Sequence, residues 1–337
     1  MKAVGYHAPL PIDHADALLD LELPTPTPRP HDLLVRVKAV AVNPVDTKVR
    51  KSAAPEPGTA KVLGWDAVGT VEALGTEVQG FAVGDRVYYA GSIDRPGTNA
   101  EMHAVDARIA AKAPATLSDA QAAALPLTSI TAYEILFDRL KVARGEASQG
   151  QSLLVMGGAG GVGSVLIQLA RELTGLRVIA TASRAETRQW CLDLGAHDVI
   201  DHHQPLAPQL AALGLPQIDM VASLTHTADY FAQYVECLKP QGQIALIDDM
   251  PTLDVVPLKR KSLSLHWELM FTRPLFSTPD MARQGELLAE VAALADAGRL
   301  RSTLAAELGT INAAHLRQAH ALLESGKAIG KVVLEGF

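Results

Sequence analysis

The stretch Ser152-Leu-Leu-Val-Met-Gly-Gly-Ala-Gly-Gly-Val-Gly163 decides the fold of this chain. Its first five residues form the continuous apolar run of a buried strand, and its glycines match the pattern G-x-G-x-x-G. A helical pattern follows over residues 162–174, and a second apolar strand is expected at residues 177–181. A glycine pattern that joins a strand to a helix inside such a unit predicts a dinucleotide-binding loop, with a ligand-free tight turn as the alternative.

The loop suits an anion because of its glycines and the helix that follows them. A residue without a Cβ lets the backbone turn tightly and approach a pyrophosphate. The amino terminus of a helix presents unpaired N–H groups and the positive end of its dipole. The residues expected to bind the cofactor are Gly158, Ala159, Gly160, Gly161, Val162 and Gly163.

Strands and helices continue to alternate on the carboxyl side of the loop. Further strands are expected at residues 198–200, 220–222, 243–247 and 262–267, and helices at residues 185–194 and 228–238. This alternation predicts an α/β fold with a doubly wound parallel sheet covered on both faces.

The first 115 residues are β-rich instead. Residues 35–42 alternate with period two, as a half-buried strand does, and shorter strands are expected at residues 68–74 and 86–89. Residues 118–143 are Ala- and Leu-rich and are expected to be helical, with Ser118-Asp119 as the cap. A later amphipathic helix ends before Gly298 and carries Met281, Leu287, Leu288, Val291 and Leu294 on one side.

Composition excludes several classes of protein. The chain has 337 residues, of which 48% are hydrophobic, and 30 basic against 37 acidic residues give a net charge of -7. No basic patch indicates nucleic-acid binding, and no apolar stretch reaches the ~18 residues of a membrane span. The amino terminus lacks a signal-peptide pattern. The two cysteines, Cys191 and Cys237, exclude a four-thiolate zinc site and favour a reducing cytoplasm.

The residues directly after the expected strand at 177–181 indicate which of the two nicotinamide coenzymes, NADH or NADPH, the chain binds. About 20 residues past the loop, NAD-binding folds place an Asp or Glu that accepts a hydrogen bond from the ribose 2′-hydroxyl. This chain has Ser183 and Arg184 there. A guanidinium suits a 2′-phosphate, so the residues predict NADPH. Ser183 with Glu186 is also a good capping box, and both roles can coexist.

Several motifs, spread along almost the whole chain, resemble the medium-chain dehydrogenase/reductase superfamily and especially its quinone oxidoreductase (zeta-crystallin-like) branch. They are Ala41-Val-Asn-Pro-Val-Asp46, Gly64-Trp-Asp-Ala-Val-Gly-Thr-Val71, Val83-Gly-Asp-Arg-Val87, Ala122-Ala-Ala-Leu-Pro126, Thr131-Ala-Tyr133, the glycine loop and Gly330-Lys-Val-Val333. The resemblance implies a GroES-like catalytic domain of residues 1–125, completed by 272–337, and a Rossmann domain of residues 126–271. It also implies a homodimer.

Members of this superfamily that oxidise alcohols bind a catalytic zinc through Cys, His and a second Cys, with a Glu nearby. The matching positions here are Asn43, Trp65, Leu127 and, for the Glu, Asp66. An indole and an isobutyl group cannot serve zinc, which needs about four N, S or O ligands. Without a Lewis acid, hydride removal from an alcohol is hard, whereas an electron-poor acceptor places its developing charge on oxygen. We therefore expect an NADPH-dependent reductase of quinones or α,β-unsaturated carbonyls.

Three residues are the candidates for catalysis. Asn43 lies where metal-free relatives keep an asparagine that donates to the acceptor or the ribose, and an Asx turn with Pro44 is the alternative. Asp46 either orients a donor or makes local backbone bonds. Thr131 resembles the threonine on the nicotinamide side of relatives, and a bond to its own helical turn is the alternative.

The remaining candidates surround the cofactor and the acceptor. His202 lies where relatives carry a tyrosine near the adenosine phosphate, and Lys331 lies in the Gly330-Lys-Val-Val motif, with a solvated side chain as the alternative for both. The residues assigned to the substrate pocket are Trp65, Tyr89, Trp267 and Phe271. Packing is the alternative for Trp65, and a contact between subunits is the alternative for Trp267 and Phe271.

Two other functions remain open at this point. One is an alcohol or aldehyde dehydrogenase of the zinc type with a non-standard metal site. The other is an NADPH-binding protein without turnover.

Overall fold

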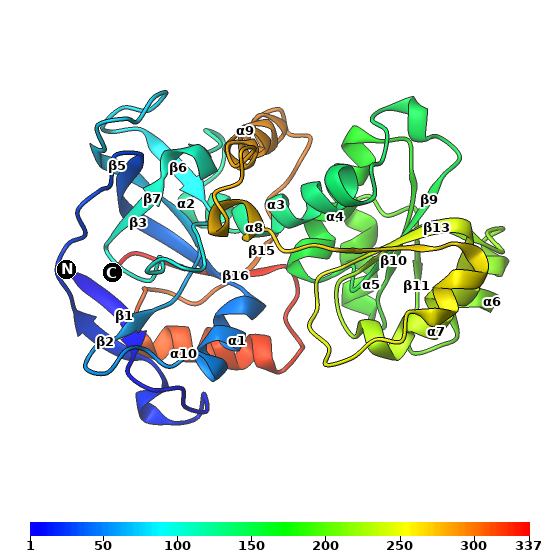
Figure 1. Ribbon diagram of the computed structural model, residues 1–337, viewed down its shortest axis with the longest axis horizontal. Coiled ribbons are helices and arrows are strands. Elements are labelled where there is room, and N and C mark those ends of the chain that lie inside the picture. The colour runs from blue at the N-terminus through cyan, green and yellow to red at the C-terminus, as the bar shows by residue number, and fades with distance from the viewer. The chain divides into compact units, whose positions relative to one another are not determined.

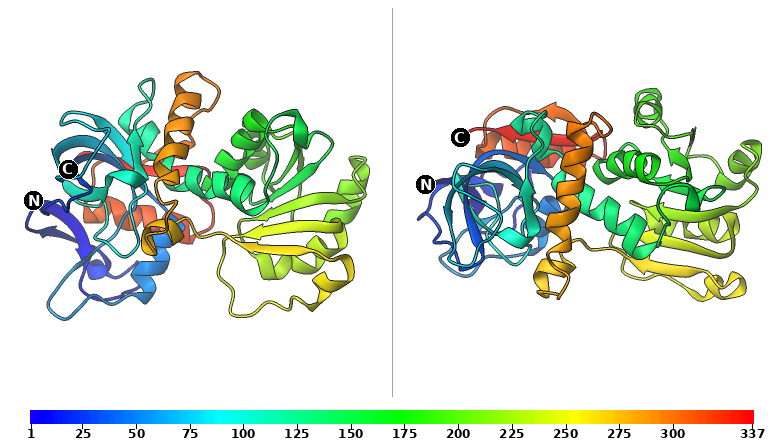
Figure 2. Two further views of the ribbon diagram at one scale, coloured as in Figure 1. Left: turned by 45° about the horizontal axis from the view of Figure 1, so that its top comes forward. Right: turned by 90° about the horizontal axis from the view of Figure 1, so that it is seen from above.

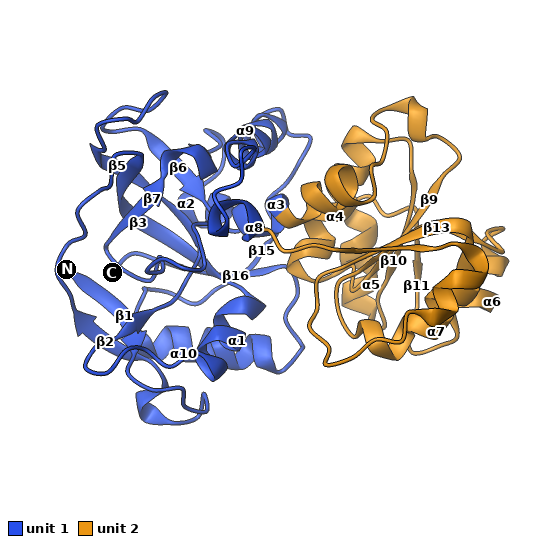
Figure 3. Cartoon of the chain, viewed as in Figure 1, with its two compact units in different colours: residues 1–130, 271–337 blue, residues 131–270 orange.

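The computed structural model describes residues 1–337. The chain divides into two compact units, shown in Figure 3. Unit 1 comprises Met1–Ile130 and Phe271–Phe337, and unit 2 comprises Thr131–Met270. The sequence places the domain boundaries at 125/126 and 271/272, and this assignment of domains stays a prediction.

Unit 2 contains one six-stranded sheet, and all of its strand pairs are parallel. Its strands are β9 (Ser152–Met156), β10 (Arg177–Thr181), β11 (Asp198–Ile200), β12 (Ile218–Ser223), β13 (Leu238–Leu246) and β14 (Ser264–Trp267). The spatial order is β11-β10-β9-β12-β13-β14, so the chain reverses direction across the sheet between β9 and β12. This is the doubly wound order of a Rossmann fold, and the predicted fold class is confirmed.

Helices cover both faces of this sheet. They are α4 (Gly161–Leu173), α5 (Ala185–Asp193), α6 (Leu206–Ala212) and α7 (Thr227–Cys237), with 3-10 turns at Glu146–Ser148 and Val256–Lys261. α4 connects β9 to β10 and α7 connects β12 to β13, on the two sides of the reversal (Figure 1). Because such crossovers are right-handed as a rule, helices on the two sides of a reversal cover opposite faces. The strands of this sheet are apolar because both faces are buried, and β9 is buried at every position.

Unit 1 is built from a seven-stranded, mostly antiparallel sheet and a three-stranded sheet. The large sheet contains β3 (Asp32–Val42), β5 (Asp66–Leu74), β6 (Arg86–Tyr89), β7 (Met102–Asp106), β8 (Ala110–Lys112), β15 (Leu304–Glu307) and β16 (Lys331–Glu335). The small sheet contains β1 (Lys2–Tyr6), β2 (Leu19–Glu22) and β4 (Lys61–Val62). β16, at the end of the chain, pairs antiparallel with β3, so the carboxyl-terminal segment completes the sheet begun near the amino terminus.

The helices of unit 1 pack around these sheets. They are α1 (Pro44–Ser52), α2 (Asp119–Ala123), α8 (Thr272–Leu275), α9 (Arg283–Asp296) and α10 (Ala313–Glu324), with 3-10 turns at Ala15–Ala17 and Ala107–Ile109. α9, the long orange helix in both views of Figure 2, packs against β8. The Tyr88 hydroxyl of β6 donates to the carbonyl oxygen of Leu288 at 2.5 Å, which fixes this contact.

The helical structure expected over residues 118–143 is confirmed as far as Arg139, with Ser118 as its N-cap residue, but it is divided into separate elements. The segment forms α2, then α3 (Pro126–Tyr133), then a π-helix over Glu134–Arg139. Pro126 has no N–H and is favoured in the first turn of a helix, so α3 begins there and does not continue α2. None of the helices in the structure is both long and apolar enough to cross a lipid bilayer.

The third glycine of the loop sets the distance between α4 and the turn before it. A Cβ on Gly163 would lie 2.5 Å from the Gly157 carbonyl oxygen and 2.7 Å from the Gly158 Cα. Both neighbours are backbone atoms and cannot rotate away. A Cβ on Gly160 would meet only the Gly157 carbonyl oxygen, at 3.4 Å.

We predict that Gly163→Ala lowers the free energy of unfolding by about 1–3 kcal/mol, because overpacking against backbone outweighs the better helix propensity of alanine. Gly160→Ala is the matched control and should change it by less than about 1 kcal/mol. Urea denaturation measures both. Equal stabilities for the two variants would contradict this account of the loop.

Candidate active site

The glycine loop of unit 2 lies at the carboxyl end of β9, where the strand order reverses. Gly157 has a φ of +78°, which favours glycine, and its N–H donates to the Thr181 hydroxyl at 3.0 Å. α4 begins at Gly161, with Gly160 as its N-cap residue and no side chain capping it. In open α/β sheets, ligands bind outside the carboxyl ends of strands at such a reversal.

The loop fits a pyrophosphate. The space into which a Cβ of Gly160 would project contains no atom within 4 Å other than the Gly157 carbonyl oxygen, so the backbone is accessible there. Gly158, by contrast, has no room for a side chain, because a Cβ there would lie 2.7 Å from the Ala180 Cβ. An anion in front of Gly160 would meet the N–H groups and positive dipole end of α4.

Ser183 and Arg184 follow β10, as expected, but the predicted capping box is wrong. The N-cap residue of α5 is Arg184, not Ser183, and the box is closed by Thr187, not Glu186. The Thr187 hydroxyl accepts from the Arg184 N–H at 3.2 Å and donates to the Arg184 carbonyl oxygen at 2.9 Å. Both of these bonds use backbone groups of Arg184, and its guanidinium lies 3.3 Å from the exposed Glu186 carboxylate.

His202 lies just after β11 and is half-buried, with its ring 4.6 Å from the ring of His203. Burial, and then the neighbouring His203, lower the pKa of His202, which disfavours the imidazolium form. A charged attraction to a phosphate is therefore weakened, and contact between His202 and the cofactor stays a prediction.

Asn43 and Asp46 lie at the start of α1 in unit 1, and both are fully buried. The Asn43 N–H donates to Asp46 Oδ2 at 2.7 Å, which satisfies an otherwise unpaired donor of the first turn. The other oxygen, Oδ1, has no hydrogen-bond partner. Burial raises the pKa of the Asp46 carboxyl to about 7, against the lowering effects of the Asn43 N–H and the Lys331 ammonium.

Asn43, Asp66 and Lys331 form a connected set in unit 1. The Asn43 Nδ2 donates to Asp66 Oδ2 at 2.8 Å, the Lys331 Nζ donates to the same oxygen at 2.9 Å, and the Lys331 Nζ also donates to Asn43 Oδ1. The side chain of Lys331 is nearly fully buried. A solvated lysine, the alternative left open for this residue, is therefore excluded.

These residues do not fit a catalytic zinc. Trp65 uses its indole N–H to bond the Ser92 carbonyl oxygen at 3.1 Å, and Leu127 offers no side-chain donor atom. The oxygens of Asn43 and Asp66 already face an ammonium group. No group of three or more His, Cys, Asp or Glu side chains in the chain is arranged to hold a metal ion.

Thr131 lies in α3, is nearly fully buried, and precedes a charged cluster that the sequence did not reveal. Arg139 Nε donates to Glu268 Oε2 at 2.6 Å, and Arg139 Nη2 lies 3.9 Å from Glu134 Oε2. Burial, and then the Glu134 carboxylate, raise the pKa of Glu268. The available signal was Glu268, the one acidic residue among the large side chains of residues 265–271.

The four residues assigned to the substrate pocket divide between the units. Trp65 and Phe271 of unit 1 are buried and pack edge-on, with ring centroids 5.8 Å apart. Tyr89 is also buried in unit 1, whereas Trp267 lies in unit 2 on the edge strand β14 and is 53% exposed. Roles for all four in binding an acceptor stay predictions.

Tyr89 has a defined partner. Its hydroxyl lies 3.1 Å from Nδ1 of His103, whose Nε2 lies 2.9 Å from the Pro96 carbonyl oxygen. Since that carbonyl can only accept, Nε2 carries the proton and the Tyr89 hydroxyl donates to Nδ1. Burial lowers the pKa of His103 to about 4, so the ring is neutral.

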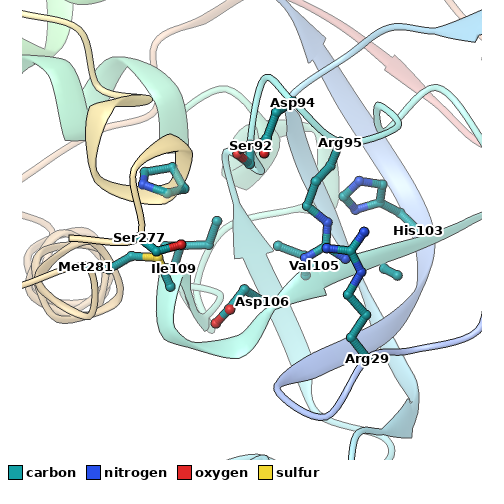
Figure 4. A pocket seen from close by; sticks show the side chains of 12 residues that line it. Arg29, Ser92, Asp94, Arg95, His103, Val105, Asp106, Ile109, Ser277 and Met281 are labelled. Atoms are coloured by element: carbon teal, nitrogen blue, oxygen red, sulfur yellow. Dashed lines mark hydrogen bonds between the residues drawn. The ribbon is translucent and has the colours of Figure 1, made fainter. Parts of the chain in front are cut away.

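His103 also borders a surface pocket of unit 1, shown in Figure 4. Arg95 lines this pocket and makes a two-point contact with Asp32, at 2.9 and 2.6 Å. Asp106 lines it too and binds Arg108 in the same way. The charges at the pocket are thus largely balanced within the protein, which gives no preference for an anionic or cationic ligand.

Two family models match the chain. The alcohol dehydrogenase GroES-like domain matches residues 29–115, and the zinc-binding dehydrogenase model matches residues 194–334. The implied GroES-like fold of the β-rich part is thereby confirmed.

The chain is similar to curated proteins of bacteria and plants. It is 40% identical, over 99% of each chain, to a zinc-type alcohol dehydrogenase-like protein of Staphylococcus aureus. It is 39% identical, over 50% of this chain and 45% of the relative, to the chloroplastic NADPH-dependent alkenal/one oxidoreductase of Arabidopsis thaliana.

Solved structures resemble it over their whole length. A putative zinc-dependent alcohol dehydrogenase of Rhizobium etli is 57% identical with a TM-score of 0.96, covering 100% of this chain and 98% of that one. Escherichia coli quinone oxidoreductase, solved with NADPH, is 25% identical with a TM-score of 0.84, covering 99% and 100%.

The unmodified protein should lose stability as the pH rises from 4 to 7, and we predict that Asp46→Asn makes this loss smaller. In that interval the native state retains a proton on Asp46 that the unfolded chain, with an ordinary carboxyl pKa of 3.8, releases. Because the folded state binds more protons than the unfolded state, the free energy of unfolding falls as the pH rises, by up to about 1.4 kcal/mol per pH unit for one group. Asparagine cannot ionise and removes this contribution.

Thermal unfolding of both proteins from pH 4.5 to 7.5 measures the effect. The exposed Asp13→Asn is the matched control and should follow the unmodified protein. Parallel curves for all three proteins would contradict a protonated, buried Asp46.

Proposed function

The chain belongs to the medium-chain dehydrogenase/reductase superfamily of oxidoreductases, and we propose that it is an NADPH-dependent reductase of quinones or α,β-unsaturated carbonyls that uses no catalytic metal. The observation that carries this proposal is the buried set of Asn43, Asp66 and Lys331. In the zinc-binding relatives, the resemblance places a zinc ligand at position 43 and the neighbouring acid at position 66. The proposal includes a homodimer, which the resemblance implies. It also includes a reducing cytoplasm as the location, which the two cysteines favour.

The choice of NADPH rests on the residues after β10. Ser183 and Arg184 replace the carboxylate that would accept a hydrogen bond from a ribose hydroxyl. The guanidinium of Arg184 is partly exposed and lies 3.3 Å from the carboxylate of Glu186, which is itself 60% exposed. Such a surface pair is worth about 1 kcal/mol or less, so a phosphate dianion can compete for the guanidinium. The NADPH in the quinone oxidoreductase structure and in the name of the plant relative supports the same choice.

The choice of acceptor follows from the charge that develops during reduction. A quinone or an enone places negative charge on oxygen, where neutral hydrogen-bond donors can stabilise it. Removal of hydride from an alcohol requires a lowered hydroxyl pKa, which a metal ordinarily supplies. The names of the quinone oxidoreductase and the alkenal/one oxidoreductase agree with this acceptor class.

When bound, the coenzyme would supply the hydride, and the chain's own residues would position it. The N–H groups around Gly160 and the start of α4 would hold the pyrophosphate, and Arg184 the 2′-phosphate. We assign Thr131 to the nicotinamide side and Asn43 and Asp46 to the acceptor side. Asp46, with a pKa of about 7, holds a proton near neutral pH and has an unpaired oxygen.

The general test is the oxidation of NADPH with a panel of quinones, 2-alkenals and enones, using protein treated with a chelator and then with or without zinc. We expect turnover with at least one acceptor class and no dependence on zinc. Stoichiometric, tightly bound zinc that restores activity would establish the alcohol dehydrogenase alternative. Coenzyme binding without turnover on any acceptor would establish the non-catalytic alternative.

We predict that Arg184→Gln weakens NADPH binding by about 10- to 100-fold and leaves NADH binding within about 3-fold. The reason is the loss of charge-assisted hydrogen bonds worth about 1.5–3 kcal/mol to the 2′-phosphate. Glu186→Gln is the matched control, since it removes the partner of Arg184 but keeps the guanidinium, and should bind NADPH at least as well. Fluorescence titration measures coenzyme binding by the unmodified protein and by both variants. Equal losses of affinity for NADPH and NADH in Arg184→Gln would refute the assignment.

A further inference from the structure

The ammonium group of Lys331 uses all of its hydrogen-bonding capacity inside unit 1. It donates to the carbonyl oxygen of Val42 at 3.2 Å, to Asp66 Oδ2 at 2.9 Å and to Asn43 Oδ1. An ammonium has three N–H donors, so each one has a partner. No donor remains for a coenzyme, which argues against the cofactor-binding role that the sequence suggests for Lys331.

The partners of Lys331 are equally committed. Asp66 Oδ2 also accepts from Asn43 Nδ2 at 2.8 Å, and Asp66 Oδ1 accepts from the N–H of Leu127 at 2.7 Å. Asn43 Nδ2 makes a second, longer contact of 3.3 Å with the carbonyl oxygen of Ala41. The amide of Asn43 is therefore locked in one orientation, with its oxygen toward the ammonium and its nitrogen toward the carboxylate.

This set joins segments that are distant in the sequence. Lys331 is the first residue of β16, Asp66 is the first residue of β5, Asn43 is the N-cap residue of α1 and Leu127 is in α3. Both charged side chains are buried, and a buried carboxylate without a partner is strongly destabilising. The cation thus holds together the elements that carry Asn43 and Asp46.

We propose that the Lys331 ammonium is the fixed internal cation of this site, a positioning residue that occupies the place among the Val42, Asn43 and Asp66 oxygens where a bound cation would otherwise be needed. Three of the connected positions, 43, 66 and 127, are those at which the resemblance places the zinc ligands and the neighbouring acid of the alcohol-oxidising relatives. In this protein the side chain of Lys331 itself occupies the place beside these oxygen atoms. Part of this inference, the kinetic effect, rests on the proposed function; the effect on stability does not.

Removal of the side chain gives a direct test, because a free alkylammonium ion can replace the missing group. Lys331→Ala leaves a vacancy next to the three oxygen atoms. We expect its unfolding temperature to fall and its kcat for acceptor reduction to fall by about 100-fold, since small misplacements of reacting groups have effects of that size. The dissociation constant for NADPH should change by less than about 3-fold.

Methylammonium chloride should then raise both the unfolding temperature and kcat of Lys331→Ala, measured well below its unfolding temperature. Tetramethylammonium chloride at the same ionic strength is the control and should restore neither, because it has no N–H donor. Lys331→Met fills the vacancy with an apolar chain of similar length, so methylammonium should not restore it.

A second route remains if Lys331→Ala does not fold. Lys331→Met combined with Asp66→Asn removes both charges, and this double variant should be more stable than Lys331→Met alone, because no unpaired carboxylate is left buried. Equal stability of the two would overturn the proposal.

The other overturning results concern Lys331→Ala itself. An unchanged unfolding temperature with NADPH binding weakened more than 10-fold would make Lys331 a coenzyme ligand. Rescue by tetramethylammonium as good as by methylammonium would show an effect of salt alone. If the unmodified protein reduces no acceptor, the proposed function fails, while methylammonium rescue of the unfolding temperature still tests the internal cation.

Discussion

The arrangement of Asn43 and its neighbours in unit 1 depends on the buried ion pair between Lys331 and Asp66. This pair links two residues that are 265 positions apart and it lies where β16, β5 and α1 begin. A carboxylate and an ammonium removed from water are costly unless every remaining donor and acceptor is satisfied. Here the Asn43 amide and the Leu127 N–H complete the set. The pair is therefore a constraint on geometry, since the charges are tolerated in only this arrangement.

Unit 2 depends on a constraint of a different kind, the absence of side chains in the glycine loop. Gly158 and Gly163 let the turn pack against β10 and against itself, and Gly160 leaves the start of α4 open. The same backbone that closes the strand–helix connection therefore presents its N–H groups to an anion. Arg184, at the N-cap of α5, adds a positive charge after the neighbouring strand. Phosphate recognition in this account needs only these backbone groups and one guanidinium.

The sequence was most informative for strands that are buried on both faces of a sheet. The strands at residues 152–156 and 177–181 coincide with β9 and β10, because parallel strands covered by helices read as continuous apolar runs. The shorter strand at residues 198–200 coincides with the edge strand β11. The segment after Ser118 is helical as predicted, but its division was not foreseen, because composition alone does not show that Pro126 starts a new helix or that residues 134–139 form a π-helix. The partners of Lys331 were not predictable either, since they depend on the antiparallel pairing of β16 with β3. Local periodicity contains no information about such distant pairs.

The measurement that tests the account most directly follows one hydride. Chelator-treated protein undergoes a single turnover with a 2-alkenal and NADPH that carries deuterium at the transferable position of the nicotinamide ring. The account predicts one deuterium atom on carbon in the saturated product, formed at the same rate with and without added zinc. A product that lacks deuterium, or one that forms only after zinc is added, would contradict it.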